Sequence, residues 1–412
     1  MWYYNKRNTM RKGQDFMKVI FSGATAYSRE KRTFVKGVDM TAMTVSSLVS
    51  AEIDSSNYHI LPGFADVHVH FREPGFSYKE TIKTGSMAAA HGGYTTVCTM
   101  PNLSPTPDSL ENLRLQLDII GRDSVIRTVP FGTITKGENG RELSDIEAMA
   151  PFVCGYSDDG RGVDDTALMR EAMQRARAVG KIISAHCEDG TQVKDSPEAE
   201  WKEIERNIRL ADETGVKLHI CHISTKESIS LIRDAKKSGV DITCETGPHY
   251  MLFSTKDERD DGRFRFNPPL REEDDRQALI EGMVDGTVDM IATDHAPHSA
   301  EEKSKGLKSM NGIVGLETAF PVMYTEFVKR GTISLEKLTH MMGVAPYERF
   351  GLEPNGFTVW NLNSEYVIDT ADFKSMGRCT PFDGRCVNGK CIATVMDGDI
   401  VYIDKALMPK PN

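Results

Sequence analysis

The chain has 412 residues, of which 39% are hydrophobic and 27% are charged, and its formal net charge is −10 at pH 7. This length is enough for one large barrel or two medium domains. The acidic balance argues against a nucleic-acid-binding surface, which normally carries a basic patch, and no apolar run approaches the roughly 18 residues of a membrane span.

The amino-terminal residues and the cysteines indicate in which compartment the protein is located. Residues 1–16 lack the apolar core of a secretory signal and are predicted to form an extended or disordered arm. The 8 cysteines are scattered, without a CxxC pair, which is typical of free thiols in a reducing compartment. We therefore expect a cytoplasmic protein that has no nucleic-acid or membrane partner.

From residue 61 to about 350, strand-like and helix-like segments alternate. The strand-like segments lie at 64–70, 95–100, 125–131, 153–157, 182–186, 218–223, 241–246 and 288–293. Helical periodicity marks 165–178, 198–213, 226–238 and 276–284, and glycine often closes these segments. Eight strands that alternate with helices predict an α/β fold, a (β/α)8 or TIM-type barrel.

The flanks of this region read differently. Short strands are predicted at 18–24 and 31–43 before the barrel, and at 357–362, 366–369, 391–396 and 399–402 after it. Two β-rich flanks around a barrel could pack together. We therefore predict a small discontinuous β domain, made of residues 17–60 and 351–412, beside the barrel at 61–350.

The stretch 66–75 reads Asp-Val-His-Val-His-Phe-Arg-Glu-Pro-Gly. His68 and His70 stand two residues apart on a strand, so their imidazoles leave the same face. Such a pair suits a divalent transition metal, zinc above all. Arg72 follows in phase and could present its guanidinium to an anion. By itself the pattern is equally compatible with a polar strand end that carries a salt-bridged arginine.

In a barrel, the chemistry lies where the carboxyl ends of the strands meet. The polar residues at the other predicted strand ends are Asn102, Asp158, Asp159, His186, His222, Asp294 and His298. The histidines and aspartates of this set, with His68 and His70, could converge on one or two metal ions. A lone histidine is usually a packed residue, but several at one level of a barrel favour a metal site.

The motifs together resemble the dihydroorotases of the amidohydrolase superfamily, in the class that has an aspartate in place of a carboxylated lysine. They cover roughly residues 61 to 320, in the family's order. The motifs are HVHFREPG at 68–75, MPN at 100–102, SDDG at 157–160, AHCED at 185–189, CHISTKES at 221–228, NPPLR at 267–271 and ATDHAPH at 292–298.

The resemblance implies a set of metal ligands. His68, His70 and Asp294 would hold one ion, His186 and His222 a second, and Asp159 would bridge the two. Asp158 is better explained as a turn carboxylate, because the family places the bridging aspartate directly before the glycine. The implied cofactor is Zn²⁺, one or two ions per subunit, although these ligands would also accept manganese or cobalt.

The resemblance also implies substrate contacts. Arg72 and Asn102 would bind a substrate carboxylate, with Asn267 and His298 completing the pocket, and Asp294 would move the proton in catalysis. Capping of local turns remains the alternative for both asparagines, because each neighbours a proline. The role of His295 stays open, as does that of the glycine-containing loop 312–318, whose amides could touch the substrate ring.

The implied activity is that of a cyclic amide hydrolase: the reversible cyclisation of N-carbamoyl-L-aspartate to L-dihydroorotate in pyrimidine biosynthesis. We expect a homodimer, and an aspartate transcarbamoylase is a candidate partner. One alternative is an allantoinase or dihydropyrimidinase, which generally use a carboxylated lysine and accept substrates that lack the carboxylate. Another is a non-catalytic partner of a transcarbamoylase. All six candidate ligands are present, which favours an enzyme.

Overall fold

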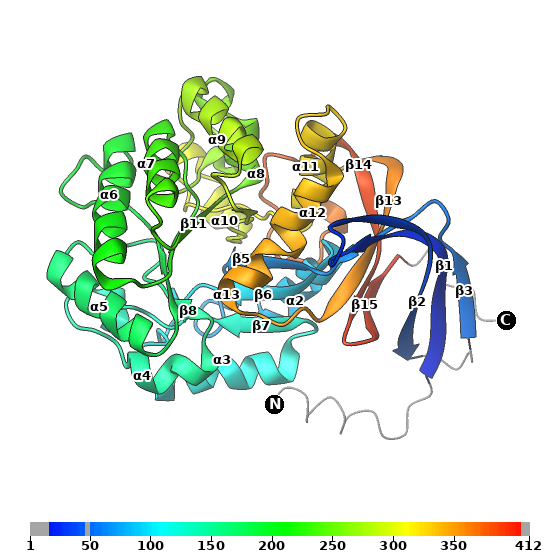
Figure 1. The fold of residues 1–412 in the computed structure, drawn as a ribbon, viewed down its shortest axis with the longest axis horizontal. Coiled ribbons are helices and arrows are strands. Elements are labelled where there is room, and N and C mark those ends of the chain that lie inside the picture. The colour runs from blue at the N-terminus through cyan, green and yellow to red at the C-terminus, as the bar shows by residue number, and fades with distance from the viewer. Residues whose placement is uncertain (1–15, 46–49, 405–412) are drawn as a thin grey trace.

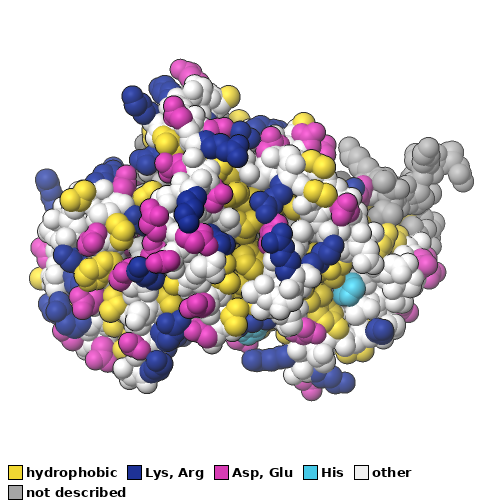
Figure 2. Space-filling view, turned by 90° about the horizontal axis from the view of Figure 1, so that it is seen from above, with side chains coloured by type: hydrophobic (Ala, Val, Ile, Leu, Met, Phe, Trp, Pro, Cys, Tyr) yellow, Lys and Arg dark blue, Asp and Glu magenta, His cyan; other side chains and the backbone are white. Residues whose placement is uncertain are grey.

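The computed structural model describes residues 16–45 and 50–404 and has a mixed α/β fold (Figure 1). Most of the predicted arm at 1–16 lies outside these residues, as do the last residues of the carboxyl-terminal flank. No helix in the described part of the chain has the length and apolar character to cross a membrane. Figure 2 shows acidic and basic side chains interspersed over one face of the molecule.

Eight short parallel strands follow one another along the chain between residues 64 and 291. A three-stranded sheet contains β5 (Phe64–Val69), β6 (Tyr94–Thr99) and β7 (Arg127–Pro130). A five-stranded sheet contains β8 (Gly155–Tyr156), β9 (Ile182–Ala185), β10 (Leu218–Ile220), β11 (Ile242–Thr246) and β12 (Met290–Ile291). Two isolated parallel bridges, Gly132↔Tyr156 and Val69↔His295, join the edges of the first sheet to the edges of the second.

Helices connect these strands. The longer ones are α2 (Ile82–His91), α3 (Leu110–Asp123), α5 (Thr166–Ala178), α6 (Pro197–Thr214), α7 (Lys226–Lys237), α9 (Glu273–Asp285), α12 (Leu335–Gly343) and α13 (Ala345–Phe350). The short ones are α4 (Ile146–Met149), α8 (Pro248–Leu252), α10 (Ala300–Lys303) and α11 (Ala319–Met323). Short 3-10 or π segments are η1 (Lys136–Glu138), η2 (Ala150–Phe152), η3 (Thr255–Asp257), η4 (Gly262–Phe264), η5 (Gly306–Lys308), η6 (Tyr324–Val328) and η7 (Thr370–Asp372).

Local sequence signals explain where the predicted helices begin and end. The side chain of Asp165 accepts hydrogen bonds from the first turn of α5, and Ser196 and Thr225 cap α6 and α7 in the same way. Gly215 ends α6 with a left-handed backbone, at φ 67°. The four predicted helical segments therefore coincide with α5, α6, α7 and α9 to within a few residues.

Strands from both ends of the chain share one seven-stranded sheet. Its order is β2 (Thr33–Val45), β15 (Asp399–Ile403), β14 (Cys386–Met396), β13 (Gly356–Val367), β4 (His59–Pro62), β1 (Phe16–Ser28) and β3 (Ser50–Asp54). In Figure 1 the blue and red-orange strands lie side by side at one end of the molecule. Strand β13 is continuous where two strands were predicted, and the sheet extends to Pro62, past the predicted boundary at residue 60.

Aromatic packing joins this sheet to the parallel strands. Trp360 of β13 is fully buried, with its ring centroid 5.8 Å from that of Phe64 on β5 and 4.2 Å from that of Phe320 on α11. Because these side chains belong to one hydrophobic core, the sheet and the parallel strands support each other.

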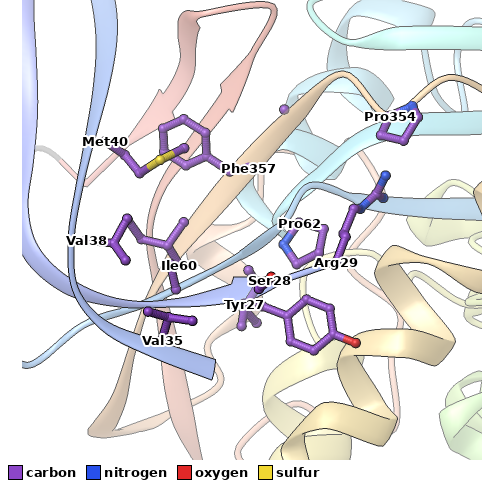
Figure 3. Close-up of a pocket in the computed structure, with 13 residues that line it drawn as sticks. Tyr27, Ser28, Arg29, Val35, Val38, Met40, Ile60, Pro62, Pro354 and Phe357 are labelled. Carbon is purple, nitrogen blue, oxygen red and sulfur yellow. The ribbon is translucent and has the colours of Figure 1, made fainter. Parts of the chain in front are cut away.

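A cleft of about 450 Å³ lies beneath the β1–β2 hairpin (Figure 3). Its lining is mainly apolar and includes Val35, Val38 and Met40 from β2 and Phe357 from β13. Arg29 follows β1, lies at this cleft and donates a hydrogen bond to the carbonyl oxygen of Gly343, which ties the hairpin to α12. Histidine and carboxylate side chains are absent from the described lining, so the cleft lacks the groups that the predicted chemistry needs.

Candidate active site

The six predicted ligands come together at the carboxyl ends of the parallel strands. Asp159 follows β8 and lies at the centre of the cluster. Its Oδ1 is 3.2 Å from His68 Nε2, 3.6 Å from His186 Nδ1 and 3.5 Å from His222 Nε2. Its Oδ2 is 3.4 Å from His70 Nε2. One carboxylate therefore faces imidazoles from three other strands.

Asp294 closes the cluster on the side of the first histidine pair. Its Oδ1 is 3.1 Å from His70 Nε2 and 3.5 Å from His68 Nε2. Asp294 and His222 both have positive φ angles, of 48° and 26°. Such angles are uncommon for residues other than glycine and are often found at functional sites, where the surrounding structure holds them.

The donor atoms form two groups that could each hold a metal ion. The first contains His68, His70 and Asp159, and the second contains Asp159, His186 and His222. Asp159 belongs to both. A third group, with His68, Cys221 and Glu245, lies on the other side of the His68 ring, whose Nδ1 already contacts Glu245.

Two buried atoms at the centre of the cluster have no well-aligned hydrogen-bond partner among the described residues. They are His68 Nε2 and Asp159 Oδ1, which face each other at 3.2 Å. Burial opposes the ionisation of Asp159, yet the neighbouring His68, His186 and His222 hold its pKa well below the ordinary value. Unsatisfied buried imidazole and carboxylate atoms are costly alone but are good ligands for a divalent cation, so these residues fit a metal centre.

Buried carboxylates behind the cluster orient its first strand. Glu245 Oε1 lies 2.6 Å from His68 Nδ1, and Glu245 Oε2 lies 3.1 Å from His219 Nε2. Asp66 accepts hydrogen bonds from the backbone amides of His68 and Thr293, and burial raises its pKa to about 7. With Nδ1 of His68 held by Glu245, Nε2 is the nitrogen that faces the cluster.

The sequence analysis missed Glu245 and assigned no functional role to His219. A signal was present, since β11 (Ile-Thr-Cys-Glu-Thr) has a glutamate near the carboxyl end of a parallel strand, where chemistry is expected. Asp158 was interpreted as a turn carboxylate, and its side chain accepts hydrogen bonds from the backbone amides of Ile134 and Thr135.

The cluster opens into a cavity of about 490 Å³ that contains the predicted substrate-binding residues. Its lining includes His70, Arg72, Phe76, Lys79, Asn102, Asp159, Gly160, His186, His222, Asn267, Asp294, Ala296, His298, Ser309, Met310, Asn311 and Gly312. Asn102 Oδ1 lies 2.9 Å from His70 Nδ1, and Asn267 Nδ2 lies 3.5 Å from His186 Nε2. The side chains of both asparagines are therefore directed toward histidines of the candidate ligand cluster.

The wall of the cavity away from the ligands is cationic. Arg72 is buried, and its Nε donates to the carbonyl oxygen of Pro297 at 3.2 Å. Burial lowers the pKa of Arg72 to about 10, which leaves the guanidinium charged at neutral pH. Lys79 lies on the same wall, with Nζ 3.0 Å from Glu302 Oε1. The sequence analysis proposed no role for Lys79 or for Glu302.

His295 is buried behind the cavity. Its carbonyl oxygen accepts a hydrogen bond from the amide of His70 at 2.8 Å. Its Nε2 lies 3.4 Å from Glu80, and its Nδ1 accepts from the amide of Gly315 at 3.2 Å. These contacts connect the end of β5 to the glycine-containing loop, of which Gly312 reaches the cavity.

Known proteins resemble this chain in sequence. Residues 58–206 match the family described as "Dihydro-orotase-like". A dihydroorotase of Fusobacterium nucleatum is 48% identical over 382 residues, which cover 86% of this chain and 89% of the relative. A dihydroorotase of Bacillus subtilis is 43% identical over 385 residues and covers 86% of this chain and 90% of its own length.

Solved structures resemble it in fold. The L-hydantoinase (dihydropyrimidinase) of Arthrobacter aurescens has a TM-score of 0.83 at 24% identity and covers 95% of this chain and 97% of its own. The dihydropyrimidinase of Brevibacillus agri has a TM-score of 0.82 at 20% identity and covers 94% and 96%. At such identities the likeness shows a shared fold.

Proposed function

The chain belongs to the dihydroorotase family, and from this we propose that it catalyses the reversible cyclisation of N-carbamoyl-L-aspartate to L-dihydroorotate, a step of pyrimidine biosynthesis. It is thus an enzyme, a hydrolase of cyclic amides. One observation carries the proposal. A single cavity is lined by the buried Arg72 and by five of the six potential metal ligands, and the sixth, His68, lies directly behind them, 3.2 Å from Asp159.

We assign two zinc ions to the ligand cluster. His68, His70 and Asp294 would hold one, His186 and His222 the other, and Asp159 would bridge them. Two observations support this assignment: His68 Nε2 and Asp159 Oδ1 have no well-aligned hydrogen-bond partner within residues 16–45 and 50–404, and Asp159 belongs to both groups of donors. A carboxylated lysine forms only by reaction with carbon dioxide, whereas an aspartate provides a bridging carboxylate without that reaction.

In the proposed reaction, bound metal and Asp294 would have different roles. Bound divalent metal would polarise the reacting carbonyl and lower the pKa of water from 15.7 to about 7. Asp294, which is within 3.1 Å of His70 and lines the cavity, would accept the proton of the attacking water and return it to the leaving ring nitrogen. In the direction of synthesis the same carboxylate takes the proton from the ureido nitrogen.

The cationic wall would recognise the substrate's free carboxylate. A guanidinium matches a carboxylate with two parallel hydrogen bonds, so Arg72 would supply the main contact. Asn102, Asn267 and His298 line the same cavity and would complete this pocket. The carboxylate distinguishes dihydroorotate from dihydrouracil, which is otherwise the same ring.

The proposal includes the architecture and the assembly. We take the eight parallel strands as a closed (β/α)8 barrel over residues 61–350, supported by the two bridges that join the sheets. Residues 17–60 and 351–412 would form the discontinuous β domain. We retain the expectation of a cytoplasmic homodimer, with a transcarbamoylase as a candidate partner. Size measurements on the purified protein, alone and mixed with the transcarbamoylase, test the dimer and the complex.

One preparation tests the activity and the metal together. Purified protein is analysed for bound metals and assayed with dihydroorotate and with N-carbamoyl-L-aspartate. We expect turnover in both directions and close to two zinc equivalents per chain. Metal-loaded protein that acts on neither compound would refute the proposal.

A dihydropyrimidinase-type activity is the second candidate, because the structural neighbours that bear this name cover nearly the whole chain. Asp159 in the bridging position and Arg72 in the cavity speak against it. Faster hydrolysis of dihydrouracil or allantoin than of dihydroorotate would reverse the order of the two candidates. A metal-free protein that is silent with every substrate but binds a transcarbamoylase would favour the non-catalytic alternative.

A further inference from the structure

Each ring nitrogen of His298 lies near one hydrogen-bond donor and one acceptor, so its neighbours are compatible with either tautomer. Its Nε2 lies 2.8 Å from the carbonyl oxygen of Asn311 and 3.3 Å from Arg72 Nη2. Its Nδ1 lies 3.3 Å from Lys79 Nζ and 3.1 Å from Glu302 Oε2. A neutral imidazole has one N–H and one lone pair, so it can satisfy only one acceptor and one donor of these four groups.

His298 stays neutral in this environment. Burial, with help from the nearby Arg72 and Lys79, lowers its pKa to about 3. The choice between the two tautomers, rather than a change of charge, therefore decides what this side chain offers to a ligand.

The contacts favour a proton on Nε2. The carbonyl oxygen of Asn311 can only accept, and at 2.8 Å it makes the shortest of the four contacts. Nδ1 then has the lone pair, and the ammonium of Lys79 is the neighbouring group that can donate to it.

Glu302 does not require the proton of His298. It already accepts hydrogen bonds from Tyr78 Oη and from the backbone amide of Ser299, both at 3.1 Å, and pairs with Lys79 at 3.0 Å. The ammonium of Lys79 is itself held in place, 5.6 Å and 5.5 Å from the ring centroids of Phe76 and Tyr78. Lys79 is only 8% exposed.

We propose that Lys79 is a positioning residue that keeps His298 in its Nε2–H tautomer, so that a bound carboxylate can share with the carbonyl oxygen of Asn311 the hydrogen bond that Nε2–H donates. The inference rests on the proposed function, which places the substrate carboxylate beside Arg72 and His298. A carboxylate only accepts hydrogen bonds, so a lone pair on Nε2 would repel it. Without Lys79, Nδ1 loses the neighbouring group that donates to it, and Glu302, which lies 3.1 Å away and can only accept, draws the proton to that side.

The first test is the zinc-loaded Lys79→Met enzyme. We expect the KM for dihydroorotate to rise about 10- to 100-fold, while kcat changes by less than about threefold. Lys83→Met, at an exposed position of α2, serves as the matched control and should match the parent enzyme. An unchanged KM in Lys79→Met would overturn the proposal.

A second substitution separates tautomer control from packing. In Lys79→Met/Glu302→Gln the new amide N–H₂ can donate to Nδ1 and restore the proton to Nε2. We therefore expect the double variant to recover most of the lost affinity. A merely structural role of the Lys79–Glu302 pair predicts the opposite, a double variant as weak as the single one or weaker.

The tautomer can be observed without turnover. In protein with ¹⁵N-labelled histidine, with His298 assigned by its loss in His298→Asn, the protonated nitrogen should be Nε2 in the parent, Nδ1 in Lys79→Met and Nε2 in the double variant. The same tautomer in all three proteins would overturn the proposal. Should the parent fail to act on dihydroorotate, the proposed function would fall while this measurement still judges the role of Lys79.

Discussion

The two halves of the cavity are built in different ways. The ligand half takes its residues from the ends of five strands, and buried carboxylates such as Glu245 and Asp66 hold it from behind. The cationic half comes from segments that follow β5 and β12. In it, His298 contacts both Arg72 and Lys79, and the part-exposed Glu302 contacts Lys79 and His298. The scaffold fixes the ligand half, whereas loops that vary easily form the half that would select the substrate.

Removing the carboxylate of Asp294 should have the largest effect, because it belongs to the chemistry of the ligand half. We expect Asp294→Ala to lower kcat by about 10³-fold. Steady-state rates and bound metal are measured on the same sample. Asp285→Ala, at an exposed position of α9, is the control. A near-normal kcat in metal-loaded Asp294→Ala would remove Asp294 from the proton transfer.

Changing Arg72 tests the cationic half. Lysine keeps the charge but loses the two-pronged geometry, so Arg72→Lys should weaken the binding of dihydroorotate by about 1.5–3 kcal/mol. The loss should appear in KM, with kcat and metal content nearly preserved. If KM for dihydroorotate is unaltered, Arg72 does not contact the substrate.

Substitution of Glu245 tests how the ligand half is supported. Glutamine cannot replace a carboxylate that lies 2.6 Å from one histidine and 3.1 Å from another, so Glu245→Gln should lower metal affinity by about 10- to 100-fold. Competition with a chelator measures this affinity. Glu281→Gln on the exposed face of α9 should behave like the parent. Equal metal affinity in Glu245→Gln and the parent would show that the carboxylate has no role in orienting His68.

The smallest expected effect concerns stability and pH in the cationic half. The folded state keeps the pKa of His298 at about 3, below the ordinary value near 6.5 in an unfolded chain. Below pH 6.5 the unfolded chain therefore binds a proton that the folded chain does not, and stability falls as the pH drops. At pH 5 this cost is at most about 2 kcal/mol.

His298→Asn removes that cost. Between pH 8 and pH 5, the difference in unfolding free energy between the variant and the parent should move in favour of the variant. Urea unfolding at several pH values measures it. A difference that is independent of pH would mean that His298 titrates normally.

The sequence predicted the ligand half better than the cationic half. His68 and His70 follow the period of a strand, and the other candidate ligands stand at strand ends, so local patterns and the resemblance selected residues that the structure brings into one cluster. Glu245 was missed because its contact with His68 spans 177 positions along the chain. Lys79 and Glu302 were missed for the same reason, since their pairing depends on how two loops fold together.

The flanks show a similar limit. Two strands were predicted at 357–362 and 366–369, but pairing with β14, from Phe357↔Val395 to Val367↔Cys386, keeps β13 continuous across an irregular register. Pairing with a partner strand thus decides the length of a strand, which the local sequence alone does not. The predicted strand at 391–396 was likewise too short, because β14 begins at Cys386.

The ratio of kcat/KM for dihydroorotate to that for dihydrouracil tests the central claim most directly, because the two rings differ by the carboxylate that the cationic half would bind. We predict a ratio of at least about 10³ for the zinc-loaded enzyme, given the usual cost of leaving buried polar groups unpaired. The ratio should fall sharply in Arg72→Lys. A ratio near one or below it would contradict the account.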